Sequence, residues 1–295
     1  MKLVGNVIEQ LINGLRTGSI YALIALGYTM VYGIAKMINF AHGDVIMVGA
    51  YALYVFIVQL KLPVPVAVIL TIIVCSVLGI TIERIAYKPL RKAPPLAVLI
   101  TAIGVSFFLQ NASQLIFSAN PRPFESIVKL KTIKIGSISI AGITVVTLTV
   151  TLVTMAALTL FINKTKAGRA MRAVSEDKGA AQLMGINVNK TISLTFAIGS
   201  ALAAIAGILF LSQYQSLNPT MGALPGIKAF VAAVLGGIGS VPGAMLGGIL
   251  LGLIESISKA YINSELSDAI VFGVLILVLL LKPSGLLGKK RIEKV

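Results

Sequence analysis

The chain has 295 residues, of which 57% are hydrophobic and 12% are charged, and its mean hydropathy is +0.97. A soluble globular domain carries about 25% charged residues, so this composition excludes one and indicates an all-α integral membrane protein. The formal net charge of +15 does not indicate nucleic-acid binding, because the basic residues lie in connections between apolar runs, without a soluble module.

Apolar runs of about 20 residues, the length that crosses a bilayer, recur from end to end, so we expect one integral membrane domain over residues 1–295. The predicted spans lie near 17–36, 44–60, 64–82, 96–118, 140–162, 190–212, 227–258 and 266–281. The run at 227–258 is too long for one ordinary crossing and is interrupted by GGIGSVPG at 236–243. We therefore predict a polytopic transmembrane helical bundle of eight to ten spans with broken segments.

Basic residues cluster in three places: around Arg84–Lys92, between Lys164 and Lys178, and from Lys282 to the end. Cytoplasmic loops are enriched in Lys and Arg, so we place all three clusters, and with them the C-terminus, in the cytoplasm. The connection 119–139 then lies outside, and the 227–258 run must cross twice. The side of the N-terminus stays open, and the N-terminal stretch does not have the pattern of a cleaved signal peptide.

A charged amphipathic segment, GRAMRAVSEDKGAAQLMGI at 168–186, interrupts the apolar sequence. We expect a short helix here, with Ser175 as its N-cap, Glu176 and Asp177 in its first turn, and Gly185 at its end. Such a helix between two spans indicates a docking surface for a soluble partner.

Polar residues gather in a second segment, where Asn39, His42 and Asp44 flank Gly43. Polar groups at membrane depth are costly and usually face a cavity or one another. Either they line or gate a path, or they satisfy backbone groups freed at a helix break. A similar glycine-rich break at Gly237, Gly239 and Gly243 suggests paired broken segments, which point to a transport pathway, although close helix packing also favours small residues.

Motifs for catalysis are absent from the sequence. It contains no G-x-x-x-x-G-K-[ST] phosphate loop, no H-E-x-x-H and no paired cysteines, since Cys75 is the single cysteine. We therefore expect no enzyme activity, no metal and no cofactor. If ATP drives this protein, another polypeptide hydrolyses it.

Three ordered motifs carry a family resemblance: INFAHGD with the following GAY at 38–51, GRAMRAVSEDKGAAQLMGIN at 168–187, and AVLGGIGSVPGAMLGGILLGLIE at 233–255. Together they resemble the branched-chain amino acid permease family of bacterial ABC importers, of the LivH type. The resemblance implies an inner-membrane permease with a cytosolic coupling loop at about 163–190. It assigns coupling to the ATPase to Arg169, Arg172, Glu176, Asp177 and Gly185.

The same resemblance implies a related second permease, two cytosolic ATP-binding subunits, and a periplasmic or lipid-anchored substrate-binding protein. Leucine, isoleucine and valine are the expected substrates, while related permeases import urea, short amides or other amino acids. A stand-alone ion-driven carrier that uses Asn39, His42 and Asp44 is the competing class, and a membrane-embedded enzyme is a more remote one.

Overall fold

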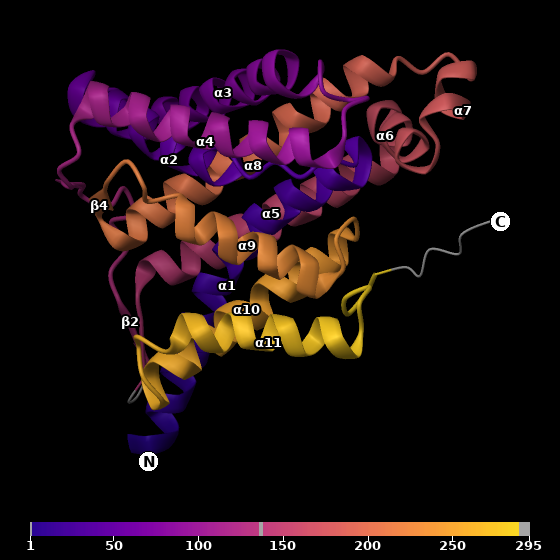
Figure 1. The fold of residues 1–295 in the computed structure, drawn as a ribbon. Helices are drawn as coiled ribbons and strands as arrows, with labels where there is room; N and C mark the ends of the chain where they lie inside the picture. The colour runs from indigo at the N-terminus through magenta and orange to yellow at the C-terminus, as the bar shows by residue number, and fades with distance from the viewer. Residues whose placement is uncertain (1, 136–137, 289–295) are drawn as a thin grey trace.

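The computed structural model describes residues 2–135 and 138–288, and long helices dominate it (Figure 1). The helices are α1 (Lys2–Ala35), α2 (His42–Tyr54), α3 (Val64–Ile82), α4 (Pro95–Phe117), α5 (Gly142–Lys164), α6 (Lys166–Glu176), α7 (Lys178–Leu183), α8 (Val188–Tyr214), α9 (Ala223–Gly236), α10 (Val241–Tyr261) and α11 (Ser267–Leu281). Helices α2 and α3 continue as π-helical turns, η1 (Val55–Gln59) and η2 (Glu83–Tyr87).

Sheet structure is confined to two short antiparallel pairs in the connections. Strand β1 (Arg122–Pro123) pairs with β4 (Ser216–Leu217), and β2 (Ile133–Ile135) pairs with β3 (Ile138–Ile140). The first pair joins segments that are far apart in the sequence, so it ties the connection after α4 to the end of α8.

Seven helices of the described chain are long and apolar enough to cross a membrane, and α9 and α11 are shorter apolar helices. The predicted all-α polytopic bundle is therefore confirmed. The 227–258 run divides into α9 and α10, as its glycines indicated. Glycine at 237 and at 239 adopts a positive φ, which side chains with a Cβ rarely do, and this ends α9.

The first span is longer than predicted, because α1 begins at Lys2 and not near residue 17. Polar residues had suggested a later start, but the fold gives them partners. Glu9 accepts hydrogen bonds from the backbone and hydroxyl of Ser139, and the guanidinium of Arg16 donates to the hydroxyl of Thr144. Both partners are more than 120 residues away in sequence, so no local pattern reveals them.

Helix α1 is the central element of the bundle. It packs against α10 along most of its length and also contacts α5, α8 and α9. Small residues allow the close approach to α10: a Cβ added at Gly252 would lie 2.2 Å from the Cα of Gly18. Helices α3, α4, α5 and α11 form the periphery, where large apolar side chains are exposed.

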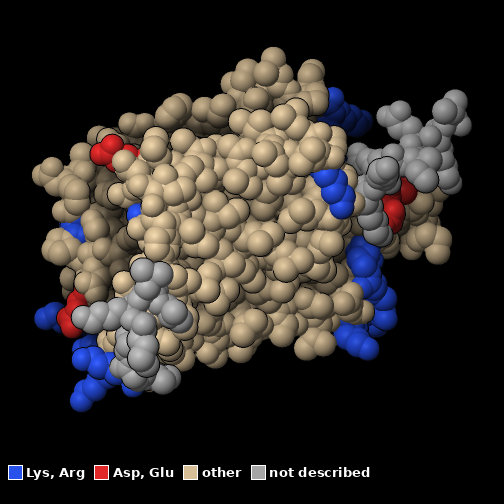
Figure 2. Space-filling view, turned by 90° about the horizontal axis from the view of Figure 1, so that it is seen from below, with Lys and Arg blue, Asp and Glu red and all other residues tan. Residues whose placement is uncertain are grey.

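The bundle has two polar ends separated by a wide apolar belt (Figure 2). The start of α1 and the strands β2 and β3 lie at one end, while α6 and α7 lie at the other (Figure 1). We call these the N-terminal end and the α6–α7 end. The basic residues Lys289, Lys290, Arg291 and Lys294 of the predicted third cluster lie outside the described residues.

Candidate functional site: a charged helical segment and a cavity beside Asp44

The charged segment between α5 and α8 forms two helices, where the sequence analysis expected one. The hydroxyl of Thr165 caps α6 by accepting a hydrogen bond from the Gly168 amide at 3.0 Å. Asp177 leaves the helical conformation and caps α7, its Oδ1 accepting from the amides of Gly179 at 2.7 Å and Ala180 at 2.9 Å. Each of the two helices therefore begins with a side-chain cap.

Ser175 is not the N-cap that we predicted. It lies inside α6, and its hydroxyl donates a hydrogen bond to the carbonyl of Arg172 at 2.7 Å. The chain turns two residues later, because Met171 and Val174 are buried and hold α6 in place against the bundle through its last turn. Glu176 consequently ends α6, and no acidic residue lies in the first turn of α7.

Helix α7 ends close to the predicted position. Gly185 follows it with φ of +79°, and the amide of Ile186 bonds to the carbonyl of Ala181 at 3.0 Å. A left-handed glycine in this place is the usual device for satisfying the last carbonyls of a helix.

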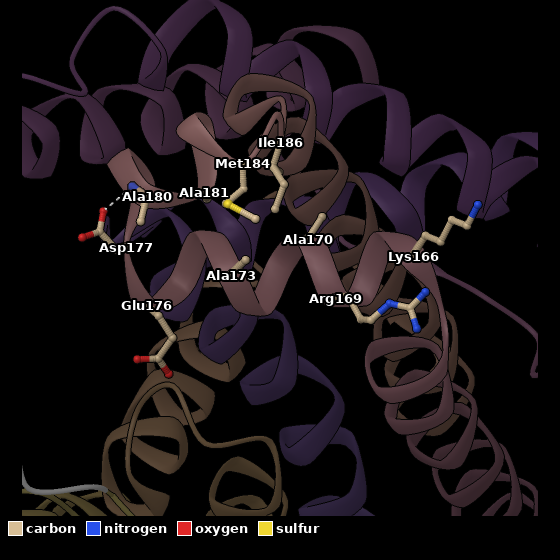
Figure 3. A pocket seen from close by; sticks show the side chains of 10 residues that line it. All are labelled: Lys166, Arg169, Ala170, Ala173, Glu176, Asp177, Ala180, Ala181, Met184 and Ile186. Carbon is tan, nitrogen blue, oxygen red and sulfur yellow. Dashed lines mark hydrogen bonds between the residues drawn. The ribbon is translucent and has the colours of Figure 1, made fainter.

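Helices α6 and α7 enclose a groove of about 490 Å³ (Figure 3). Arg169, Glu176 and Asp177 lie at its edges, and alanine and methionine side chains form its floor. Met184, which lines the groove, is 82% exposed, and the neighbouring Leu183 is 90% exposed. Large apolar side chains in water, rimmed by charges, are typical of a protein interaction site.

Two of the five predicted coupling residues do not line this groove. The guanidinium of Arg172 donates to the carbonyl of Ile162 at 3.0 Å and to Asn163 at 2.8 Å, which fastens α6 to the end of α5. Gly185 shapes the turn after α7. The structure thus brings Arg169, Glu176 and Asp177 together and gives the other two supporting positions.

We call α6 and α7 the docking segment, after the role predicted from the sequence. This segment also contacts the bundle core, which the sequence analysis did not foresee. The Nζ atom of Lys178, at the start of α7, donates to the carbonyl oxygen of Ala35 at 2.9 Å. Ala35 is the last residue of α1, where a cation stabilises the negative end of the helix dipole.

In the second predicted segment, Asn39, His42 and Asp44 are all buried, and their side chains reach different helices. The Oδ1 of Asn39 accepts from the hydroxyl of Tyr87 at 2.8 Å. The ring of His42 packs edge-on against Tyr28 of α1, with centroids 4.7 Å apart. Asn39 is thereby joined to η2 and His42 to α1, so each side chain holds two elements together.

Asp44 lies in the first turn of α2, and its Oδ1 accepts a hydrogen bond from Gln110 of α4 at 2.9 Å. Beside it is a small cavity of about 180 Å³. The side chain of Ser106 and the apolar side chains of Phe40, Ile103 and Ile227 also line this cavity. It is therefore a mostly apolar space with one carboxylate at its edge.

The N-termini of α2 and α9 meet at this cavity. Gly43 packs directly on the start of α9: a Cβ at position 43 would lie 2.7 Å from the carbonyl oxygen of Gly222. Helix N-termini carry a partial positive charge, so two positive helix ends and the Asp44 carboxylate border the same space. Such an arrangement suits a small zwitterion.

The glycine break at Gly237, Gly239 and Gly243 lies elsewhere. It connects α9 to α10 at the α6–α7 end, where Ser240 caps α10 and Gly239 faces Gly33 near the end of α1. Gly33 is six residues beyond Gly27, which contacts His42, a helical rise of about 9 Å. The chain leaves the helical conformation here between α9 and α10, and this break is separate from the Asp44 cavity.

Sequence analysis missed a buried ionic cluster on the other side of α9. The Nζ of Lys228 contacts Glu255 of α10 at 2.9 Å and Asp268 of α11 at 2.6 Å. Glu255 also accepts from the hydroxyl of Tyr21 at 2.8 Å and from Lys259. A lysine inside the apolar run 223–236 was the available signal. The cluster joins four helices with its charges paired, which indicates a structural role.

A multi-pass helical bundle that exposes a charged segment at one end and holds Asp44 beside a mostly apolar cavity has the features of a transport permease. The family described as "Branched-chain amino acid transport system / permease component" matches residues 10–279, and this chain belongs to it. The chain is 46% identical to the high-affinity branched-chain amino acid transport system permease protein BraD of Pseudomonas aeruginosa, over 98% of both chains. It is 47% identical to LivH of Salmonella typhimurium and 46% identical to LivH of Escherichia coli K12, over 98% of this chain and 97% of each relative.

Proposed function

We propose that this chain is the membrane-spanning subunit of an ATP-driven importer of branched-chain amino acids in a bacterial inner membrane. The α6–α7 segment carries the ATP-driven part of this proposal, because it offers a rigid, charged and partly apolar surface to a soluble partner. The substrate class follows from relatives that are similar over nearly their whole length and are named for that transport.

The assembly that we propose contains a related second permease, two cytosolic ATP-binding subunits and a periplasmic or lipid-anchored substrate-binding protein. The sequence of this chain lacks a phosphate-binding loop, which supports placing ATP hydrolysis on separate subunits. Arg169, Glu176 and Asp177 at the edge of the groove would meet the ATPase directly. Arg172 and Gly185 would hold the docking segment in shape.

The proposed orientation places the α6–α7 end and the C-terminus in the cytoplasm and the N-terminus outside. The basic residues around Arg84–Lys92 support it, because Arg91 contacts Asn189 beside the docking segment. The start of α1 lies at the opposite end, with Glu9 bonded to Ser139. In this orientation the N-terminus, whose side the sequence left open, lies outside.

The cavity at Asp44 is the proposed substrate contact within the membrane. An amino acid passing it would place its ammonium group near the Asp44 carboxylate and its carboxylate near the N-termini of α2 and α9. Ile103, Ile227 and Phe40 provide apolar contacts for an aliphatic side chain. Asn39 and His42 would support the path by holding the segment before α2.

Purification of the tagged chain in mild detergent, followed by reconstitution, tests the proposal. We expect two ATPases and a second permease to co-purify, and leucine-loaded binding protein to stimulate ATP hydrolysis and uptake into liposomes. A solitary chain that takes up leucine under an ion gradient, without any ATPase, would replace the proposal with an ion-driven carrier.

A further inference from the structure

A larger cavity, of about 590 Å³, lies at the α6–α7 end of the bundle. It forms where the end of α1, the connection 88–94, the start of α4 and the start of α7 meet. Three basic residues, Lys36, Arg91 and Lys178, line it together with mostly apolar side chains, and the described lining residues include neither Asp nor Glu. The cavity is therefore an electropositive space with apolar walls.

The described contacts balance the positive charge of Arg91 but not that of Lys178. Arg91 forms a salt bridge with Glu83, which is buried behind the cavity and also accepts a hydrogen bond from Ser193 at 2.6 Å. Lys178 bonds to a backbone carbonyl, which is polar but carries no formal charge. Burial and the nearby charge of Arg91 lower the pKa of Lys178. The start of α4 at Pro95 adds the positive end of a helix dipole.

The apolar walls continue onto the surface of α4. Leu96 lines the cavity and is 65% exposed, and Ile100, one turn further along, is 61% exposed. In a membrane protein such side chains border the acyl-chain region. Basic pockets between helices at the cytoplasmic membrane surface bind anionic lipid headgroups, and this cavity joins both features in one place.

We propose that this cavity binds the phosphate group of an anionic phospholipid, held by Lys36, Arg91 and Lys178, with an acyl chain along Leu96 and Leu99. The shared chemistry is a phosphate anion, and the apolar walls favour a lipid over free phosphate as its source. Because Lys178 belongs to α7, the bound lipid ties the docking segment to the end of α1. This inference does not depend on the transported substrate.

The chain contains no tryptophan, so a single introduced tryptophan reports on the lipid beside it. Leu96→Trp places the reporter at the cavity, and Leu115→Trp places a matched one at the far end of the same helix, where the side chain is 88% exposed. Each full-length variant is reconstituted in nanodiscs of phosphatidylcholine with a small fraction of brominated phosphatidylglycerol or brominated phosphatidylcholine. We expect several-fold stronger quenching by the phosphatidylglycerol at position 96, and equal quenching at position 115.

Removal of the cations tests the assignment of the headgroup. Lys36→Asn suits the left-handed backbone at that position, φ +60°, and Lys178→Gln keeps a donor for the Ala35 carbonyl. Each is expected to reduce the preference for phosphatidylglycerol about fivefold. Lys190→Gln removes an exposed cation from the same end of the bundle and serves as control, with no expected effect.

Equal quenching by the two lipids at position 96, or an undiminished preference in the double variant Lys36→Asn/Lys178→Gln, would overturn the proposal. Addition of millimolar inorganic phosphate distinguishes the sources. If phosphate abolishes the preference and raises the melting temperature in pure phosphatidylcholine, free phosphate is the ligand and the lipid assignment is wrong. Mass spectrometry of lipids retained by the intact transporter, without the reporter, checks the same variants: phosphatidylglycerol enrichment that the double variant loses supports the site.

Discussion

The Nζ atom of Lys178 on α7 donates a 2.9 Å hydrogen bond to the carbonyl oxygen of Ala35, the last residue of α1. Helix α1 also packs against α5, α8, α9 and α10. Together with the packing of α6 on α1, this contact therefore connects the docking segment to the centre of the bundle. A force on α7 therefore has a short route to α1.

Replacement of Lys178 by methionine removes this hydrogen bond and is expected to uncouple ATP hydrolysis from uptake. A hydrogen bond to a charged group contributes about 1.5–3 kcal/mol, so we expect a severalfold loss in leucine taken up per ATP hydrolysed. The Lys178→Gln variant retains a hydrogen-bond donor, so its uptake per ATP hydrolysed should lie between those of the wild type and Lys178→Met. Equal transport by all three proteins, measured in proteoliposomes with the complete transporter, would contradict the proposed link.

Asp177 has two separable properties, a negative charge at the groove and the cap of α7. Asp177→Asn keeps the capping oxygen, whereas Asp177→Ala loses it at a cost of about 1 kcal/mol to the helix. If the cap is what docking requires, the asparagine variant binds the ATPase normally and the alanine variant binds several-fold more weakly in a pull-down titration. Ser175→Ala should have no effect, because Ser175 caps neither helix.

The elements that the sequence predicted well depend on local properties. The break at Gly237 followed from glycines, which are needed where φ is positive, and the spans followed from apolar length. The failures depend on distant contacts. The start of α1 was misplaced because Glu9 is satisfied by Ser139, and Lys228 was overlooked because its partners arrive from α10 and α11 only when the helices pack.

The contact between the starts of α2 and α9 requires glycine. In Gly43→Ala the new Cβ would lie 2.7 Å from the Gly222 carbonyl oxygen, an overlap that either separates the helices or strains them, at a cost of about 1–3 kcal/mol. We expect a lower melting temperature in detergent. Gly104→Ala is the matched control, since no other part of the described chain lies within 4 Å of a Cβ added at this position, and it should be neutral or slightly stabilising.

Asp44→Asn tests the substrate contact in the membrane. Asparagine can still pair with Gln110, so the fold is kept while the charge for a substrate ammonium group is lost. Removal of a charged hydrogen-bond partner predicts a reduction in uptake of about tenfold or more. Leucine affinity of the separate binding protein, measured by calorimetry, should not change. Wild-type uptake by Asp44→Asn would exclude Asp44 from the path.

Lys228 is expected to be the most sensitive charged residue for stability. Lys228→Met leaves the buried carboxylate of Glu255 with Tyr21 and Lys259 alone, and breaking a buried ion pair costs about 3–5 kcal/mol. Because those two partners remain, we expect a loss near the lower limit, measured as the free energy of unfolding in mixed micelles. The double variant Lys228→Met/Glu255→Gln should recover part of the lost stability, because glutamine carries no charge and still accepts from Tyr21.

The control is Lys259→Met, at a side chain that is 44% exposed, which should cost less than about 1 kcal/mol. If Lys228→Met is as stable as the wild type, the cluster does not hold α9 against α10 and α11.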